Sequence, residues 1–288
     1  MSGIEIKTYS SPQKMMAEWE DWLEMRPAVN NLLLGLLYRI GRREAAGGEV
    51  DALMVGVWED GVQKVALLRT PPRELVVALA EEGAEVAMEA AAGWLRENLP
   101  DLPGVVGPHA AADAIGRAFP DKELQVGFLQ RVMQVDRLVP AEPCVGQMRL
   151  SAPGDMELLA KWFQAFFNES LNKPLQSTEA VQLSKAKIMD KGTWVWEVDG
   201  EVVSMAGVER PTRNGITVVL VYTPPAHRGH GYASNLVGQI SDLQFRQGRK
   251  FLCLHTDAAN PTSNKIYEAL GYYQVGEGGI WQLGLVDS

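Results

Sequence analysis

The chain has 288 residues, and its content of 46% hydrophobic and 22% charged residues is typical of a globular protein. The formal net charge of −9 argues against nucleic acid as a partner, since an acidic surface repels phosphate backbones. The longest apolar run, "NLLLGLLYRIG" from Asn31, is shorter than the roughly 18 residues of a membrane span. We therefore predict a buried helix there and no membrane partner.

The two cysteines and four histidines lack the spacing of a metal site or of a disulfide framework. Cys144 and Cys253 form no CxxC pair, and the histidines form no HExxH motif. The first ten residues contain no apolar segment of the kind found in signal peptides. We therefore predict a cytoplasmic protein without a metal.

The N-terminal half shares a hairpin pattern with the C-terminal half. Residues 57–73 read "VWEDGVQKVALLRTPPR", and residues 195–213 read "VWEVDGEVVSMAGVERPTR". Trp196 follows Trp58 by 138 residues, and Pro211 follows Pro72 by 139. Each stretch is typical of two strands joined by an Asp-Gly turn. Hairpin composition explains part of the likeness, but the shared order of these residues favours a duplicated domain.

A break near Pro140 and Pro143 separates the two copies. We predict a first domain over residues 1–140 and a second over residues 141–288. The first has a helical pattern around residues 84–95, but no glycine-rich loop precedes it, and Glu81 and Glu82 would repel phosphate. We expect this half to be structural or to shape one wall of a substrate cleft.

The second domain has a mixed α/β pattern that is not a strict βαβ alternation. After a strand at Met148–Leu150, we expect helices within residues 151–170 and over 178–190. The remaining expected elements are strands at 193–198, 201–209 and 216–222, a helix from 232, a strand at 250–256, a helix at 263–271, and strands at 272–276 and 280–286. The predicted fold class is α/β, in the α+β sense of a mixed sheet with helices.

A glycine-rich turn, "PPAHRGHGYASN" at Pro224–Asn235, lies between a predicted strand and a predicted helix. Gly229 and Gly231 allow a tight turn, and the amide groups that follow lie at the start of the helix. Free N–H groups, the helix dipole and the charge of Arg228 predict a phosphate site, with an ordinary glycine turn as the alternative. A P-loop would need Lys-Ser or Lys-Thr after the last glycine, and a dinucleotide site would need glycine at Ser234.

Two motifs resemble those of the GCN5-related N-acetyltransferases, the GNAT superfamily. "RGHGYA" resembles the Arg-x-x-Gly-x-Ala turn of that family, and "NPTSNKIYEALGY" resembles its Asn-x-x-Ala-x-x-x-Tyr-x-x-x-Gly-Phe pattern. Ser263 and Tyr272 depart mildly from the second pattern. The resemblance covers roughly residues 148–288, and the whole chain resembles bacterial proteins with two such domains, the first degenerate. It implies two mostly antiparallel twisted sheets, each flanked by helices.

The resemblance implies acetyl-CoA as the cosubstrate and suggests its binding residues. The turn would hold the pyrophosphate, the end of the preceding strand would pair with the pantetheine arm, and the last motif would approach the arm and its sulfur. These residues are Arg228, Gly229, His230, Gly231, Tyr232, Ala233 and Ser234 in the turn, Val221, Tyr222 and Thr223 in the strand, and Asn260, Asn264 and Tyr267 in the last motif.

The implied chemistry is direct attack of a primary amine on the thioester. Tyr267 stands where the family often places the acid for the leaving thiolate, and the alternative is an aromatic residue that fills the core. His255, on the predicted fifth strand, is the candidate base because histidine has a near-neutral pKa. The alternatives for the base are Glu209 or water alone. The alternative for His255 is a structural role, in which the histidine is hydrogen-bonded to the backbone. We expect Cys253 to be a core residue.

We therefore predict an acetyl-CoA-dependent N-acetyltransferase with a small-molecule or peptide amine as acceptor, acting as a monomer or homodimer. A non-catalytic acyl-CoA-binding sensor and a nucleotide-binding structural protein are the alternatives. Trp162, Phe166 and Glu169 have helical spacing, so we expect them to pack in the core, or else to line the acceptor pocket.

Overall fold

The computed structural model describes residues 3–171 and 174–285, and the chain divides into two units. The first unit comprises Met1–Arg131 and Gly276–Ser288, and the second comprises Val132–Val275. This division differs from the predicted domains 1–140 and 141–288, because the end of the chain joins the first unit. A break in composition cannot show such a return, since it depends on strand pairing between distant residues.

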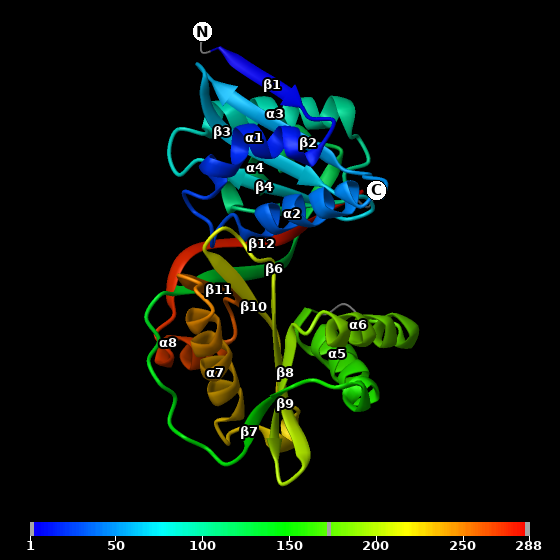
Figure 1. Ribbon diagram of the computed structural model, residues 1–288. Helices are drawn as coiled ribbons and strands as arrows, with labels where there is room; N and C mark the ends of the chain where they lie inside the picture. The colour runs from blue at the N-terminus through cyan, green and yellow to red at the C-terminus, as the bar shows by residue number, and fades with distance from the viewer. Residues whose placement is uncertain (1–2, 172–173, 286–288) are drawn as a thin grey trace. The chain divides into compact units, whose positions relative to one another are not determined.

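The first unit is a mixed sheet with helices on both faces (Figure 1). Its strand order is β1-β2-β3-β4-β5-β12, and β4 and β5 are parallel. Its elements are β1 (Ile4–Thr8), α1 (Pro12–Leu23), α2 (Asn31–Ala45), β2 (Leu53–Glu59), β3 (Val62–Arg69), β4 (Leu75–Leu79), α3 (Glu85–Asn98), β5 (Gly104–Gly107), α4 (His109–Ala118), most of β6 (Lys122–Val135) and the end of β12 (Tyr273–Leu285).

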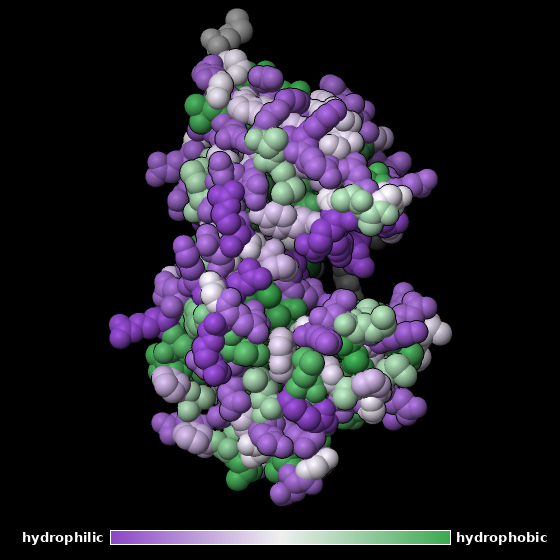
Figure 2. Space-filling view, viewed as in Figure 1, coloured by the Kyte–Doolittle hydropathy of each residue, from purple (hydrophilic) through white to green (hydrophobic). Residues whose placement is uncertain are grey.

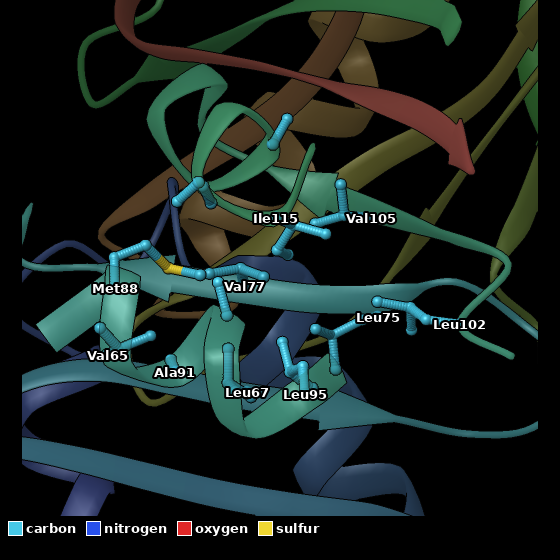
Figure 3. Packing of buried hydrophobic residues seen from close by; sticks show 14 of the residues in the cluster. Val65, Leu67, Leu75, Val77, Met88, Ala91, Leu95, Leu102, Val105 and Ile115 are labelled. Carbon is cyan, nitrogen blue, oxygen red and sulfur yellow. The ribbon is translucent and has the colours of Figure 1, made fainter. Parts of the chain in front are cut away.

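Apolar side chains fill both faces of this sheet, because alternate residues of a strand point to opposite sides. On one face, Val65 and Leu67 of β3 and Val77 of β4 meet Met88 and Leu95 of α3 (Figure 3). The opposite face packs against α1 and α2. The first unit therefore has its own hydrophobic core.

The second unit repeats this order of elements. Its strands lie in the order β11-β10-β9-β8-β7, and β10 and β11 are parallel. Helices α5 and α6 cover one face, and α7 and α8 cover the other (Figure 1). Its elements are β7 (Gln147–Leu150), α5 (Met156–Leu171), α6 (Ser177–Met189), β8 (Thr193–Val198), β9 (Glu201–Glu209), β10 (Gly215–Tyr222), α7 (Tyr232–Arg246), β11 (Phe251–Asp257) and α8 (Pro261–Ala269).

The predicted hairpin repeat has the same backbone conformation in both units. Asp60 and Gly61 have φ values of 50° and 79°, and Asp199 and Gly200 have values of 49° and 83°. Left-handed conformations at both central residues are those of a type I′ turn, which suits the twist of a hairpin. Each hairpin also has an irregular register beside its tryptophan, Trp58 or Trp196.

Most predicted elements are confirmed, but the end of the chain is a correction. The apolar run from Asn31 is helix α2, and strands 193–198 and 201–209 have the predicted bounds. The two strands expected at 272–276 and 280–286 are instead a single strand, β12, within the described residues. The glycines between them make no turn. A Cβ on Gly278 would lie 2.6 Å from the carbonyl oxygen of Gly107, so glycine is needed there for close packing.

Hydrophilic residues cover most of the surface seen in Figure 2. Within residues 3–171 and 174–285, no helix is both long enough and apolar enough to cross a membrane. The same residues contain no group of three His, Cys, Asp or Glu side chains arranged to hold a metal ion.

Candidate functional site

The parallel strands β10 and β11 pair over a short stretch at the centre of the second unit. The register joins Gly215–Thr217 to Phe251–Cys253, although the strands continue to Tyr222 and Asp257. Strand β10 also bulges away from β9 between Val219 and Tyr222. A bulge bends a strand and frees backbone groups from the ladder. Beyond Thr217 and Cys253, β10 and β11 are therefore not paired with each other, and we call this unpaired stretch of the two strands the slot.

The bulge includes Leu220, which has a φ of 54°. Left-handed backbone is costly for a residue with a branched side chain, and such strain is often found at functional sites. The strain therefore marks the slot as a candidate binding site.

The glycine-rich turn has the conformation that its sequence predicts. Gly229 and Gly231 have φ values of 83° and 78°, and Gly231 is the N-cap of α7 without a capping side chain. The first backbone bond of the helix runs from the N–H of Asn235 to the carbonyl of Gly231. The N–H groups of Tyr232–Ser234 therefore have no acceptor inside the helix. They point out of its positive end, which is where an anion binds.

A buried asparagine fixes the shape of this turn. The Nδ2 atom of Asn235 donates to the carbonyl oxygens of Gly231, at 3.0 Å, and of Glu142, at 2.8 Å. A Cβ on Gly231 would lie 3.8 Å from the Cβ of Cys144. The turn is thus held from the helix and from residues 142–144.

Arg228 is fixed by neighbours on two sides. Its Nε donates to the carbonyl of Thr223 at 2.9 Å, and its Nη2 donates to Glu169 at 2.6 Å. The hydroxyl of Tyr222 donates to the other oxygen of Glu169 at 2.8 Å. Burial raises the pKa of Tyr222 to about 12, with a further contribution from Glu169. The carboxylate of Glu169 therefore ties α5 to the end of β10 and to the turn.

Two asparagines of the last motif lie at the start of α8. Asn260 caps the helix, because its side-chain oxygen accepts from the N–H of Ser263 at 3.1 Å. Asn264 is buried, and its Nδ2 donates to the carbonyl of Asp257 at 3.2 Å. Its Oδ1 is buried without a hydrogen-bond partner. Such a group costs free energy unless a ligand or water satisfies it, so Asn264 is a candidate to accept a hydrogen bond.

Tyr267 also lies on the buried side of α8. Its side chain is 8% exposed and packs 5.9 Å from the ring of Tyr272. Burial raises its pKa, so the hydroxyl stays protonated at neutral pH. No hydrogen bond of this hydroxyl is recorded within the described part of the chain. Both the predicted role as an acid and the core alternative agree with this placement.

His255 lies on the opposite face of β11 from the residues that pack against α8. Leu252 and Leu254 join the cluster of Tyr267, and alternation turns Cys253 and His255 the other way. The Nε2 atom of His255 is buried without a partner. Burial and the nearby charge of Arg210 lower the pKa of His255 to about 3. The histidine is therefore neutral at physiological pH, and its pKa differs from the near-neutral value expected.

The reserve candidate base, Glu209, is on the same face as His255. Glu209 pairs with Thr217 in the register of β9 and β10, and Thr217 pairs with Cys253. Glu209 forms ion pairs with Lys187 and, at 3.7 Å, with Arg210. Burial raises the pKa of Cys253 to about 11. Because Cys253 is fully buried, its predicted place in the core is confirmed.

An open cavity of about 450 Å³ adjoins the turn. Ser234 at the start of α7 lines it together with one face of α8. The lining residues of that face are Pro261, Thr262, Lys265, Ile266 and Ala269. The cavity therefore reaches Ser234, the last residue of the turn, and carries one lysine, Lys265.

The family comparison covers most of the second unit. Residues 156–272, which contain the slot, the turn and α8, match the Acetyltransferase (GNAT) family. These residues form a GNAT acetyltransferase domain. No curated protein matches the chain.

Solved structures show that the GNAT fold occurs in both units. An acetyltransferase from the GNAT family of Colwellia psychrerythraea has a TM-score of 0.58 and 13% identity, and covers 98% of this chain and 100% of its own. A GCN5-related N-acetyltransferase from Sphaerobacter thermophilus has a TM-score of 0.61 and 14% identity, with coverage of 99% and 98%. A tandem GNAT protein from the clavulanic acid biosynthesis pathway has a TM-score of 0.58 and 12% identity, with coverage of 99% and 100%. The predicted tandem fold is confirmed.

The contacts of two residues in the GNAT domain, Glu169 and Asn235, were not predicted from the sequence. Glu169, expected to pack in the core or else to line the acceptor pocket, binds Tyr222 and Arg228. Asn235 clamps the turn, and its place four residues after a glycine N-cap was the signal in the sequence. Trp162 is buried against Tyr222, as its helical spacing predicted, and Phe166 packs at the edge of the same cluster.

Proposed function

We propose that the protein transfers the acetyl group of acetyl-CoA to a primary amine. The observation that carries this proposal is the uncapped, left-handed start of α7 at Gly231, next to the slot between β10 and β11. An anion site beside a row of free backbone groups suits a ligand with phosphates at one end and an amide-containing arm at the other. The match of residues 156–272 to GNAT acetyltransferases supports acetyl-CoA as that ligand.

The residues of the turn would hold the pyrophosphate through their backbone. Amide groups from Gly229 to Ser234 offer several donors at the positive end of a helix. The backbone of Val221–Thr223 would pair with the arm as an added strand does. Asn264 offers a buried acceptor for an amide N–H of the arm, while Asn260 is engaged as a helix cap.

The residues on the two faces of β11 suit different parts of the reaction. In the transfer, the C–N bond forms, the C–S bond breaks, the amine loses a proton and the thiolate gains one. Tyr267, on the α8 face, would donate a hydrogen bond to the leaving sulfur. A backbone N–H of the bulge would stabilise the oxyanion. The amine would approach from the opposite face, where His255 lies.

His255 is a weak base in this arrangement, because its pKa is lowered to about 3. It would accept a hydrogen bond from the amine or from a water molecule without holding a full proton. The proton would then pass to solvent. The enzyme would therefore bind the acceptor as the free amine, and the pH dependence of the rate would follow the ionisation of that amine.

A panel of amines tests the proposal. Full-length protein is incubated with acetyl-CoA and with amino acids, polyamines, aminoglycosides or peptides, and both CoA release and product mass are followed. We expect an amide product from at least one class, with release that depends on the acceptor. Binding of acetyl-CoA without turnover of any class would instead support an acyl-CoA sensor.

A further inference from the structure

We propose that the cavity beside the start of α7 binds the 3′-phosphoadenosine end of the cofactor, and that Lys265 recognises its 3′-phosphate. The inference rests on the proposed function and adds to it, since the turn and the slot account only for the pyrophosphate and the pantetheine arm. The cavity measures about 450 Å³ and reaches Ser234. Ligand pockets usually measure about 300 to 1,000 Å³, so this one is large enough for a nucleoside.

One face of α8 lines this cavity, and another face of the same helix is buried. The lining residues have the spacing of neighbours on one side of a helix. They are Pro261, Thr262, Lys265, Ile266 and Ala269. Asn264 and Tyr267 alternate with them in the sequence and are buried. Helix α8 therefore separates the residues proposed to approach the arm from an open face that can take another part of the same ligand.

The lining of the cavity carries a positive charge. Lys265 is exposed, and its ammonium group forms no ion pair or hydrogen bond with any other residue in 3–171 and 174–285. No described lining residue is acidic, although the chain has 36 acidic residues and 27 lysines and arginines. The first turns of α7 and α8, at Ser234 and at Pro261, add the positive ends of two helices. The cavity therefore favours an anion.

Most of the remaining lining is apolar. Pro261, Ile266 and Ala269 contribute ring and aliphatic carbon atoms, and Pro261 and Ala269 are exposed. A purine base would remove this apolar surface from water, whereas a small anion alone would leave it uncovered. An apolar wall beside a single cation therefore suits a nucleotide better than a free phosphate.

The order of the groups in coenzyme A matches the order of these sites. Its pyrophosphate joins the pantetheine arm to the ribose, and the ribose carries a phosphomonoester on its 3′ carbon. The N–H groups of Tyr232–Ser234 would hold the pyrophosphate, and Ser234 also lines the cavity. A pyrophosphate at the turn thus has the cavity beside it for the nucleoside while the arm enters the slot. The phosphomonoester carries nearly two negative charges at neutral pH and would attract the ammonium group of Lys265.

Coenzyme A and dephospho-coenzyme A test the inference, because they differ only in the 3′-phosphate. Calorimetry measures their affinities for the full-length protein at one fixed ionic strength. We expect the wild type to bind coenzyme A about 10-fold more tightly, the lower end of the range for a hydrogen bond between charged groups. Lys265→Gln should weaken the binding of coenzyme A by about 5- to 10-fold and that of dephospho-coenzyme A by less than about 2-fold. Lys265→Arg, which keeps the charge, should retain most of the preference.

A charge at the far end of the lining gives an independent test. Ala269→Glu places a carboxylate one helical turn from Lys265, where it would compete with the phosphate for the ammonium group. This variant should lose about 5-fold in affinity for coenzyme A and less for dephospho-coenzyme A. Ala269→Gln is its uncharged match and should keep both affinities within about 2-fold. Lys161→Gln, at an exposed position of α5, controls for the loss of a lysine and should change neither affinity.

The outcomes separate this inference from the proposed function. All variants should keep the thermal unfolding temperature of the wild type, because positions 265 and 269 are exposed. Equal affinities of the wild type for the two ligands would overturn the inference. So would an unchanged affinity for coenzyme A in Lys265→Gln, or an equal loss for both ligands. A wild-type protein that binds neither ligand would instead overturn the proposed function.

Discussion

The corner between a strand and the following helix occurs at equivalent places in the two units, but residues 80–84 form it in the first unit and the longer stretch 223–231 forms it in the second. In the second unit, β10 bulges at Leu220, and two left-handed glycines lead into α7. In the first unit, β4 pairs with β3 without a register shift, and a single glycine, Gly83, precedes α3. The loop of the first unit contains Glu81 and Glu82, whereas the loop of the second unit contains Arg228. One fold can therefore hold or lack a phosphate site through its loop alone.

The strands that follow these corners, β11 and β5, also differ in the titratable side chains that they carry. Strand β11 carries Cys253, His255 and Asp257, and it leads to the two asparagines and the tyrosine of α8. Strand β5, its counterpart, reads "GVVG" and has no titratable side chain. The comparison shows that the second unit combines a glycine start of α7 with titratable side chains on β11, whereas β5 of the first unit has no such side chain.

The largest expected effect comes from a negative charge at Gly231. Gly231→Asp should weaken acetyl-CoA binding by about 100-fold, because a carboxylate close to the turn repels phosphate. Gly231→Asn is its uncharged match and should weaken binding by about 10-fold or less, since both residues tolerate left-handed backbone. Calorimetry measures the affinities.

The equivalent change in the first unit is the control. Gly83 also has a positive φ, of 62°, so Gly83→Asp imposes a similar backbone constraint. We expect its affinity for acetyl-CoA to stay within 2-fold of the wild type. Equal losses of acetyl-CoA affinity in Gly231→Asp and Gly83→Asp would contradict the proposal that only the second corner binds the cofactor.

The next effect concerns the tyrosine of α8. Tyr267→Phe should lower kcat by about 10²-fold, the lower part of the range for a lost general acid, with little change in acetyl-CoA affinity. Tyr272→Phe is the matched control, because its hydroxyl bonds to the Oγ of Ser241 at 3.0 Å. That control should lose about 1 kcal/mol of stability and keep its kcat. Similar kcat values for both variants would mean that Tyr267 packs in the core and does not act as an acid.

These local features explain how much of the site could be predicted from the sequence. Gly229 and Gly231 follow from conformational needs that lie within the turn itself, so their spacing was sufficient. The pKa of His255 could not be predicted, because it depends on burial and on Arg210, which is 45 residues earlier in the chain. The single strand β12 was also missed, since the glycines around Gly278 serve a contact with Gly107.

A smaller effect is expected in the pH dependence of stability. His255 has a folded pKa of about 3, below its unfolded value of about 6.5. Between these values the unfolded chain binds the proton and the folded chain does not, so stability should fall as the pH drops through this window. Above pH 7 the histidine should have no such effect.

His255→Gln removes this contribution. Between pH 6 and pH 5, wild-type protein should lose up to about 1 kcal/mol of unfolding free energy more than the variant. Urea denaturation at both pH values measures the difference. The acid limb of the rate profile should move with the pKa of the acceptor and persist in the variant. A limb that stays near pH 6.5 with every acceptor and vanishes in His255→Gln would make the histidine a true general base.

The smallest effect is expected at the carboxylate that holds Arg228. Glu169→Gln removes the charge of a pair that is 40% and 52% exposed, so stability should change by less than about 1 kcal/mol. Acetyl-CoA should bind up to about 3-fold more tightly, because one negative charge leaves the neighbourhood of the turn. Glu157→Gln, at the exposed start of the same helix, should leave the affinity unchanged. Weaker binding in Glu169→Gln would mean that the position of Arg228 matters more than the charge of Glu169.

The number of acetyl-CoA molecules bound by each chain tests the central claim most directly. Native mass spectrometry of the wild-type protein at saturation counts them without any assumption about the acceptor. We predict one molecule for each chain, bound by the second unit and lost in Gly231→Asp. Two molecules for each chain, or one that persists in Gly231→Asp and is lost in Gly83→Asp, would contradict the account.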